Sequence, residues 1–203
     1  VNFENVEIVG NNETTLIGDQ NENRLSGGNG IDRIIGNGGS DVLNGGGGRD
    51  YFVFKSGLGS SSADRILDFN AGNGGDVLQL DYDGALTSTG FSFRSIDLSS
   101  GGKKTLGNNT DILLLRGEKY LSEEQVLENL NGLNGLEEQY SQFQKSVQIC
   151  LWESQLSDSL NVSIISDTKI DALFANDIFT IAHLSDLGQI NYSEFSATNF
   201  EIL

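Results

Sequence analysis

The stretch GDQNENRLSGGNGIDRIIGNGGSDVLNGGGGRDYFVF, residues 18–54, repeats a pattern of nine residues. Each copy begins with a glycine, at Gly18, Gly27, Gly36 and Gly45. The eighth place of every copy is large and apolar, and is filled by Leu25, Ile34, Leu43 and Phe52. The sixth place is polar, and is filled by Asn23, Asp32, Asp41 and Asp50. A degenerate copy that begins near Val9 has Thr14 at the sixth place and Leu16 at the eighth. Such a short fixed period indicates a solenoid of stacked copies.

Each repeat has a loop half and a strand half. Glycines at close spacing allow positive φ and let backbone carbonyls crowd together, and the loop must satisfy these polar groups without a core. Carbonyls plus one carboxylate suit Ca²⁺, which takes about six to eight oxygens at about 2.3–2.6 Å. Three residues of strand, such as 42–44, bury one large side chain and become stable only when copies stack.

The pattern resembles the RTX, or hemolysin-type, nonapeptide G-G-x-G-x-D-x-U-x. The copies at 27–35 and 45–53 match it fully, and the copy at 36–44 departs at Asn37. The copy at 18–26 is degenerate. The resemblance implies a parallel β-roll with two repeats per turn, in which loops eighteen residues apart share a calcium ion. Two alternatives are a metal-free solenoid and a disordered linker. A linker has no need of a regular apolar place, and a metal-free solenoid would align carboxylates that repel one another.

The resemblance also implies which residues bind calcium. On one side of the roll it pairs one loop's Gly28, Gly30 and Asp32 with Gly45, Gly47 and Asp50. On the other side it pairs Asp19, Asn21 and Asn23 with Gly36, Gly38 and Asp41. The neighbouring loop residues Asn37, Gly39, Gly46 and Gly48 complete the candidate set. Because Asn23 replaces a carboxylate, we expect a weaker site on its side. A further pairing of the Thr14 loop with Gly27, Asn29 and Asp32 has even less support.

The segment DRILDFNAGNGGDVLQLDYDG, residues 64–84, follows the repeats. It resembles the family's terminating strands, of the form D-x-I-x-D-F and D-x-L-x-L. By that resemblance Asp64, Asp68 and Asp76 are ligands of the last calcium sites. The alternative for each is an ordinary solvated acid in a turn.

Composition narrows the classes of partner. The 203 residues carry a net charge of −17, and the isoelectric point is about 4.1. This charge argues against nucleic acid and anionic membrane surfaces as partners. No segment approaches the roughly 20 apolar residues of a membrane span, and one cysteine, Cys150, excludes an internal disulfide. A first residue Val1 suggests a fragment or a processed chain.

We expect an all-β fold with two short helices and two domains. Residues 1–84 form the calcium-binding roll, and residues 85–203 form an antiparallel, sandwich-like part. Strands are predicted near 91–96, 111–116, 161–166 and 177–184. A capping box at Ser122 and Gln125 starts one helix, and a second helix is predicted from Asn134. The alternation of Val147, Ile149 and Leu151 also fits a strand.

Two non-enzymatic functions fit these features, and an enzyme contained in residues 85–203 is a third alternative, although that region shows no constellation of catalytic residues. His183 is the only histidine, so HExxH is excluded, and no G-x-S-x-G elbow occurs. The ending Glu201-Ile202-Leu203 resembles the C-terminal secretion signal of serralysin-like proteases. The chain is therefore predicted to be a calcium-folded module of a larger extracellular protein, exported by type I secretion machinery. The alternative is a polysaccharide-binding or adhesion module, like those of alginate epimerases, which retention on alginate would test.

Overall fold

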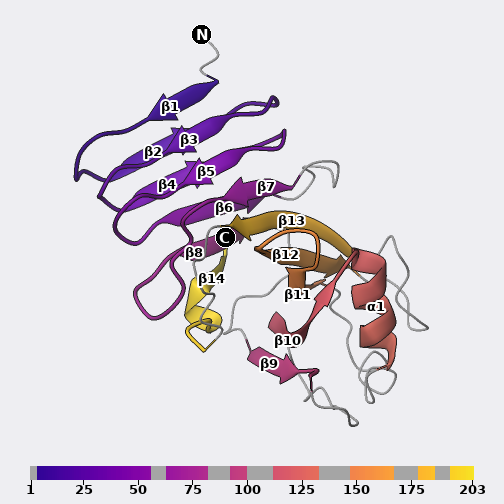
Figure 1. Ribbon diagram of the computed structural model, residues 1–203. Coiled ribbons are helices and arrows are strands. Elements are labelled where there is room, and N and C mark those ends of the chain that lie inside the picture. Colours follow the sequence, from indigo (N-terminus) through magenta and orange to yellow (C-terminus); the bar gives the residue numbers. More distant parts are fainter. Residues whose placement is uncertain are drawn as a thin grey trace. The chain divides into compact units, whose positions relative to one another are not determined.

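The computed structural model is mostly β (Figure 1), as the sequence predicts. It describes residues 4–55, 63–81, 92–99, 112–132, 147–166, 178–185 and 193–203. The chain divides into two compact units, one of residues 1–84 with 181–203 and one of residues 85–180. Residues 181–203, which the sequence placed in the second part, thus belong to the first unit. Within the described ranges, no helix is long and apolar enough to cross a membrane.

The first unit contains two parallel sheets, between which successive strands of the roll alternate. One sheet holds, in order, β1 (Asn5–Glu7), β3 (Arg24–Ser26), β5 (Val42–Asn44), β7 (Asp64–Ile66) and β13 (Ile178–Ser185), of which residues from 181 belong to this unit. The other holds β2 (Thr14–Ile17), β4 (Asp32–Ile35), β6 (Tyr51–Lys55), β8 (Val77–Asp81) and β14 (Phe200–Ile202). This arrangement is a β-roll with one turn per two repeats.

The eighth-place side chains form the core of the roll. Leu25 pairs in register with Leu43, and Leu43 with Ile66. In the opposite sheet the register runs through Leu16, Ile34, Phe52, Leu78 and Phe200. All these residues are buried. Phe69 packs against Phe52 and stacks on Phe195. The predicted stacking of the inward side chains is confirmed. They form one row in each sheet, and Phe200 of the C-terminal segment extends one of these rows.

The second unit is a mixed sheet with one described α-helix. Its strands follow the order β12 (Ser159–Ser166), β11 (Val147–Ser154), β10 (Ile112–Tyr120) and β9 (Phe93–Asp97). β11 and β12 are antiparallel, whereas β10 is parallel to both β9 and β11. The β-rich prediction is confirmed, but the sheet is not wholly antiparallel. Val147 begins the strand β11, so the alternation of Val147, Ile149 and Leu151 indicated the correct secondary structure. The helix predicted from Asn134 lies outside the described residues.

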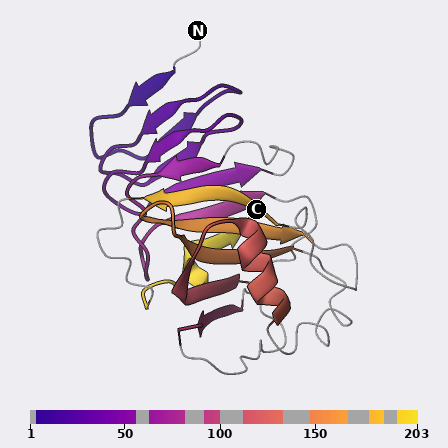
Figure 2. The same ribbon diagram turned by 45° about the vertical axis from the view of Figure 1, so that its right-hand side comes forward.

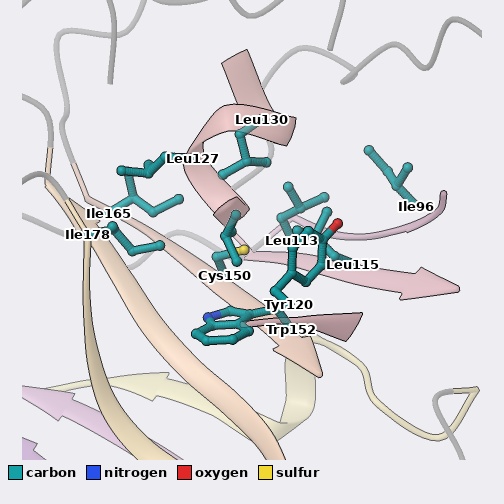
Figure 3. Packing of buried hydrophobic residues seen from close by; sticks show 11 residues of the cluster. Ile96, Leu113, Leu115, Tyr120, Leu127, Leu130, Cys150, Trp152, Ile165 and Ile178 are labelled. Carbon is teal, nitrogen blue, oxygen red and sulfur yellow. The ribbon is translucent and has the colours of Figure 1, made fainter. Parts of the chain in front are cut away.

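The helix α1 (Glu123–Gly132) covers the core of this unit. The backbone N–H of Gln125 donates to the Ser122 hydroxyl, as expected for the predicted helix start, and α1 lies beside β10 in Figures 1 and 2. Its apolar face contributes Val126, Leu127 and Leu130 to a buried cluster that includes Tyr120 and Trp152 (Figure 3). No residue named in this cluster belongs to the repeats.

Candidate calcium-binding loops

The repeat loops lie where the chain crosses between the two sheets of the roll. Residues 27–31 and 45–50 lead from the β3, β5 sheet to the β4, β6 sheet. Residues 18–23 and 36–41 lead in the opposite direction. Loops of one kind therefore collect at one edge of the roll, and loops of the other kind at the opposite edge. Asp32 and Asp50 consequently share one edge, and Asn23 and Asp41 the other.

Backbone-to-carboxylate hydrogen bonds join the sixth-place residues of each edge into a ladder. In the Asp32 ladder, the N–H of Asp32 donates to Asp50 Oδ1 at 2.9 Å, and the N–H of Asp50 donates to Asp76 Oδ1 at 2.9 Å. In the Asn23 ladder, the N–H of Asn23 donates to Asp41 Oδ1 at 2.7 Å. The N–H of Asp41 donates in turn to Asp64 Oδ1 at 2.9 Å. Each carboxylate is thus fixed by the loop one turn before it.

The glycines permit the close stacking of successive loops. The carbonyl of Gly28 accepts a hydrogen bond from the N–H of Gly47 at 2.8 Å. A Cβ on Gly46, whose φ is +92°, would lie 2.0 Å from that same carbonyl oxygen. A Cβ on Gly45 would lie 2.3 Å from Asp50 Oδ2. Glycine is therefore required here by both space and backbone conformation, and carbonyl oxygens are brought next to a carboxylate.

The loops at the opposite edge stack in the same way, but side chains take a larger part in their hydrogen bonds. The carbonyl of Asp19 accepts from the N–H of Gly38 at 2.9 Å, while the Asp19 carboxylate turns to Asn21 and is exposed. Asn37 takes the glycine-like φ of +67°, and its side-chain amide donates to the Gly18 carbonyl at 2.7 Å. This bond gives a reason for the departure at Asn37 from the repeat pattern.

The remaining predicted glycines also lie in the stacked loops. A Cβ on Gly30 would meet the Asn12 carbonyl, one on Gly48 the Gly30 carbonyl, and one on Gly39 the Asn21 carbonyl. One on Gly36 would meet Asp41 Oδ2, and one on Gly38 the Gln20 side chain. The structure thus brings every predicted glycine to an interface between loops or against the carboxylate of its own loop.

The ladder carboxylates are buried, and among the residues that the structure describes none of them forms an ion pair. No ladder residue exposes more than 6% of its surface. Loss of hydration, together with the charges of Asp76, Asp32 and Asp68, raises the pKa of Asp50 to about 7. Burial likewise raises the pKa of Asp64 to about 7, that of Asp76 to about 6, and that of Asp41 above its ordinary value. The charged carboxylates need a compensating positive charge.

Among the residues that the structure describes, two buried carboxylate oxygens have no hydrogen-bond partner, Asp32 Oδ1 and Asp41 Oδ2. One belongs to each ladder. An unpaired buried acceptor costs free energy, and a divalent cation would satisfy it. No group of three or more His, Cys, Asp or Glu side chains able to hold a metal occurs among the described residues. The donor set is therefore one or two carboxylates plus carbonyls, which fits Ca²⁺ rather than Zn²⁺.

Asp68 occupies a different position from the ladder residues. Its Oδ1 accepts from the N–H of Gly45 at 2.8 Å, and its Oδ2 accepts from the N–H of Gly46 at 2.7 Å. Asp68 therefore adds a third negative charge that acts on Asp50, besides those of Asp32 and Asp76. The three acids predicted after the repeats thus divide, with Asp64 in the Asn23 ladder and both Asp68 and Asp76 beside Asp50.

One residue that contacts these loops, Asn199, was not expected from the sequence. Its side chain is hydrogen-bonded to Gly72 and to the carbonyl of Asp76. Asn199 is 123 residues from Asp76 and belongs to no repeat, so no periodic signal could have revealed it.

The comparisons with known proteins agree with this geometry. Residues 17–52 match the RTX calcium-binding nonapeptide repeat in four copies. No curated protein matches the chain. The matched residues include the ladder members Asn23, Asp32, Asp41 and Asp50. Residues 17–52 of this chain are therefore RTX calcium-binding nonapeptide repeats.

Proposed function

We propose that this chain is a calcium-induced folding module that acts outside the cell after type I secretion, and that it is not an enzyme. The observation that carries the proposal is the pair of ladders, in which buried carboxylates stand one turn apart and one carboxylate oxygen of each ladder lacks a hydrogen-bond partner among the described residues. Such an arrangement is unfavourable in the metal-free chain, because the charges are desolvated and repel one another. Calcium supplies the missing charge, and the stacked carbonyls and carboxylates supply its ligands.

The candidate ligand sets follow the edges of the roll. At one edge, neighbouring members of the series Asp32, Asp50 and Asp76, at most two to an ion, would hold calcium with the carbonyls of the loops 27–31 and 45–50. At the other edge, Asp41 and Asp64, with the carbonyls of the loops 18–23 and 36–41, would hold it. The second set starts from Asn23 instead of a carboxylate. Affinity follows the charge of the ligands, so this set is the weaker of the two.

The energies involved are sufficient to control folding. Extracellular calcium modules have dissociation constants of about 10⁻⁴–10⁻³ M. A single site of this strength would be only modestly saturated by millimolar calcium. If coupling between stacked loops tightened a site until calcium stood at about a hundredfold excess over its dissociation constant, that site would stabilise the folded state by about 2.7 kcal/mol. Several such sites equal the whole stability of a small domain, about 5–15 kcal/mol. Low cytosolic calcium would leave the roll unfolded for export, and extracellular calcium would then fold it.

A calcium titration of the purified chain tests the folding proposal. Hydrogen exchange and far-UV circular dichroism are measured in EGTA, in CaCl₂ and in MgCl₂. We expect amides of residues 14–54 to be protected only with calcium, since Mg²⁺ requires a stricter octahedral geometry. Equal protection in EGTA and in calcium would overturn the proposal.

An export assay tests the secretion part separately. The chain is expressed in bacteria with and without a type I secretion apparatus, together with a variant that lacks residues 201–203. We expect export of the intact chain only with the apparatus, and loss of export for the shortened variant. Equal export of both chains would contradict a role of Glu201, Ile202 and Leu203 in secretion.

A further inference from the structure

Asn199 is a fully buried polar side chain that connects residues 196–203 with the loop 70–76. Its surface exposure is 0%. Its Nδ2 donates to the carbonyl of Asp76 at 2.9 Å and to that of Gly72 at 3.2 Å. Its Oδ1 accepts from the N–H of Gly72 at 3.3 Å and from that of Ser196 at 3.2 Å. Donors and acceptor of this amide are thus all used between two segments of one unit.

Asn199 is itself held from both sides. It ends the short 3₁₀ helix η2 (Ala197–Asn199), which Ser196 caps by accepting from the N–H of Thr198. The next residue, Phe200, begins β14 and pairs in register with Leu78. The cap and the strand together fix the backbone of Asn199, so its side chain meets the loop in one orientation.

The loop 70–76 needs such support because of its conformation. Gly72 and Gly74 have φ values of +113° and +84°, and glycine is the residue that loses most freedom when it is ordered. Within the loop, the N–H of Asp76 donates to the Asn70 carbonyl at 2.7 Å, and the N–H of Asn70 donates to Asp76 Oδ2 at 2.7 Å. Asn199 adds bonds at Gly72 and at Asp76, the two ends of the turn.

Asp76 is the residue whose position matters for calcium. Its Oδ1 accepts from the N–H of Asp50 at 2.9 Å and so continues the Asp32 ladder. Asn199 binds the main-chain carbonyl of this same residue. A carboxylate in a loop becomes a good ligand only if its backbone is held in place, because ordering the loop otherwise opposes binding.

We propose that Asn199 is a positioning residue for calcium at the Asp76 end of the Asp32 ladder. It holds the backbone of Asp76 and thereby couples calcium binding to the ordering of residues 196–203. This inference rests on the proposed calcium-induced folding. Because coupling between two sites is reciprocal, calcium stabilises β14, and an ordered β14 raises the affinity for calcium.

The test compares the full chain with three variants. Asn199→Asp keeps the size of the side chain but removes both donors, and Asn199→Ala removes the whole amide. Thr198→Ala is the matched control, since the Thr198 hydroxyl bonds only to the Ser196 hydroxyl among the described contacts. Calcium isotherms are recorded by titration calorimetry, and hydrogen exchange is followed in residues 70–80 and 200–203.

The expected result has two parts. Asn199→Asp and Asn199→Ala weaken the tightest calcium-binding phase about tenfold, while Thr198→Ala leaves it unchanged. In the unaltered chain, residues 200–203 and 70–80 gain protection at the same calcium concentration. In Asn199→Ala, residues 200–203 become protected only at higher calcium.

Three results would overturn the inference. Calcium isotherms of both Asn199 variants that equal that of the unaltered chain would make Asn199 a structural anchor only. A loss of calcium affinity in Thr198→Ala as large as that in Asn199→Ala would show that Asn199 has no particular role in calcium binding. If neither Asn199 variant folds, hydrogen exchange of the unaltered chain tests the coupling. Protection of residues 200–203 in EGTA would contradict it. Protection of residues 200–203 and of residues 70–80 at different calcium concentrations would also contradict it. If only residues 14–54 gain protection with calcium, this inference is wrong while the proposed function stands. If no residue gains protection with calcium, the proposed function itself is wrong.

Discussion

The two ladders of the roll have the same hydrogen-bonding plan but different charge. In both, a carboxylate oxygen accepts the backbone N–H of the rung before it. The Asp32 ladder has a carboxylate at every rung and Asp68 close by. The Asn23 ladder begins with an amide, which accepts from the N–H of Asp19 at 2.8 Å. The same bond within a loop is made by a carboxylate in the copy at 27–35, where the N–H of Gly28 donates to Asp32 Oδ2 at 2.7 Å. An amide oxygen therefore serves the loop geometry at the sixth place as well as a carboxylate does, and cation binding is what a negative charge there would favour.

The largest effect is expected from a side chain added between stacked loops at the Asp32 edge. In Gly46→Ala, the new Cβ would collide with the Gly28 backbone at 2.0 Å, and alanine disfavours a φ of +92°. We expect a loss of about 3 kcal/mol or more in calcium, measured by urea unfolding. Gly47→Ala is the control, since its nearest neighbour is the Asn29 side chain at 3.3 Å. Equal losses in the two variants would refute this explanation.

A change of pH should alter the metal-free chain strongly and in one direction. Asp50 and Asp64 have pKa values of about 7 in the folded roll, against about 3.9 for an unfolded aspartate. The folded state therefore binds more protons between about pH 4 and pH 7, and its stability falls as pH rises through this range. Circular dichroism in EGTA should show more β structure at pH 5 than at pH 8.

The calcium-loaded chain provides the control for this pH effect. Protons compete with calcium for the same carboxylates, so acidification should weaken calcium binding while it favours the metal-free fold. A metal-free chain whose β content rises with pH would show that the ladder carboxylates are not buried in this way.

Neutralising one carboxylate in each ladder should separate the two classes of calcium site. Asp50→Asn keeps the acceptor for the N–H of Asp32 but removes charge from the stronger set, and Asp41→Asn does the same in the weaker set. We expect Asp50→Asn to lower the affinity of the tight phase about tenfold, or about 1.4 kcal/mol. Asp41→Asn should affect only the weak phase. Identical calorimetric isotherms for the two variants would show that the ladders do not differ in strength.

The smallest predicted effect is a gain in the weaker ladder. Asn23→Asp retains the oxygen that accepts from the N–H of Asp19 and adds the carboxylate that the repeat pattern has at this place. We expect the weak calcium phase to tighten by up to about tenfold, with lower stability in EGTA because of added repulsion. Gln20→Glu adds the same charge at an exposed place of the same loop, outside the predicted ligand set, and serves as the control. If both variants tighten binding equally, general charge accounts for the effect.

The sequence predicted the regular part of the roll well, for a physical reason. Leu25, Ile34 and their equivalents recur every nine residues because each copy contributes one inward side chain, and this rule can be read directly. The assignment of Asp32 and Asp50 to one edge and of Asp41 to the other came from the resemblance to the RTX family, which implies two repeats per turn. Beyond the repeats the period is lost, and only resemblance to the family indicated Asp64 and Asp76.

Other features could not be read from the chain. The return of residues 181–203 to the first unit depends on pairing of β13 with β7 and of β14 with β8, which no local pattern encodes. The parallel pairing of β10 with β9 and β11 was missed because alternation in a strand does not specify the direction of its neighbour. Asn199 acts through a contact 123 residues away and looks in the sequence like any polar residue before a strand.

The ladder bond also restricts how such a protein can change length during evolution. The step between rungs is 18 residues at Asn23–Asp41 but 23 at Asp41–Asp64 and 26 at Asp50–Asp76, yet the bond is the same. Extra residues are therefore tolerated between rungs. A duplication of a single nonapeptide, in contrast, would move every later acid to the opposite edge and exchange the two sheets. Gene segments that encode whole turns are thus the natural unit of duplication, and copy number should grow in pairs.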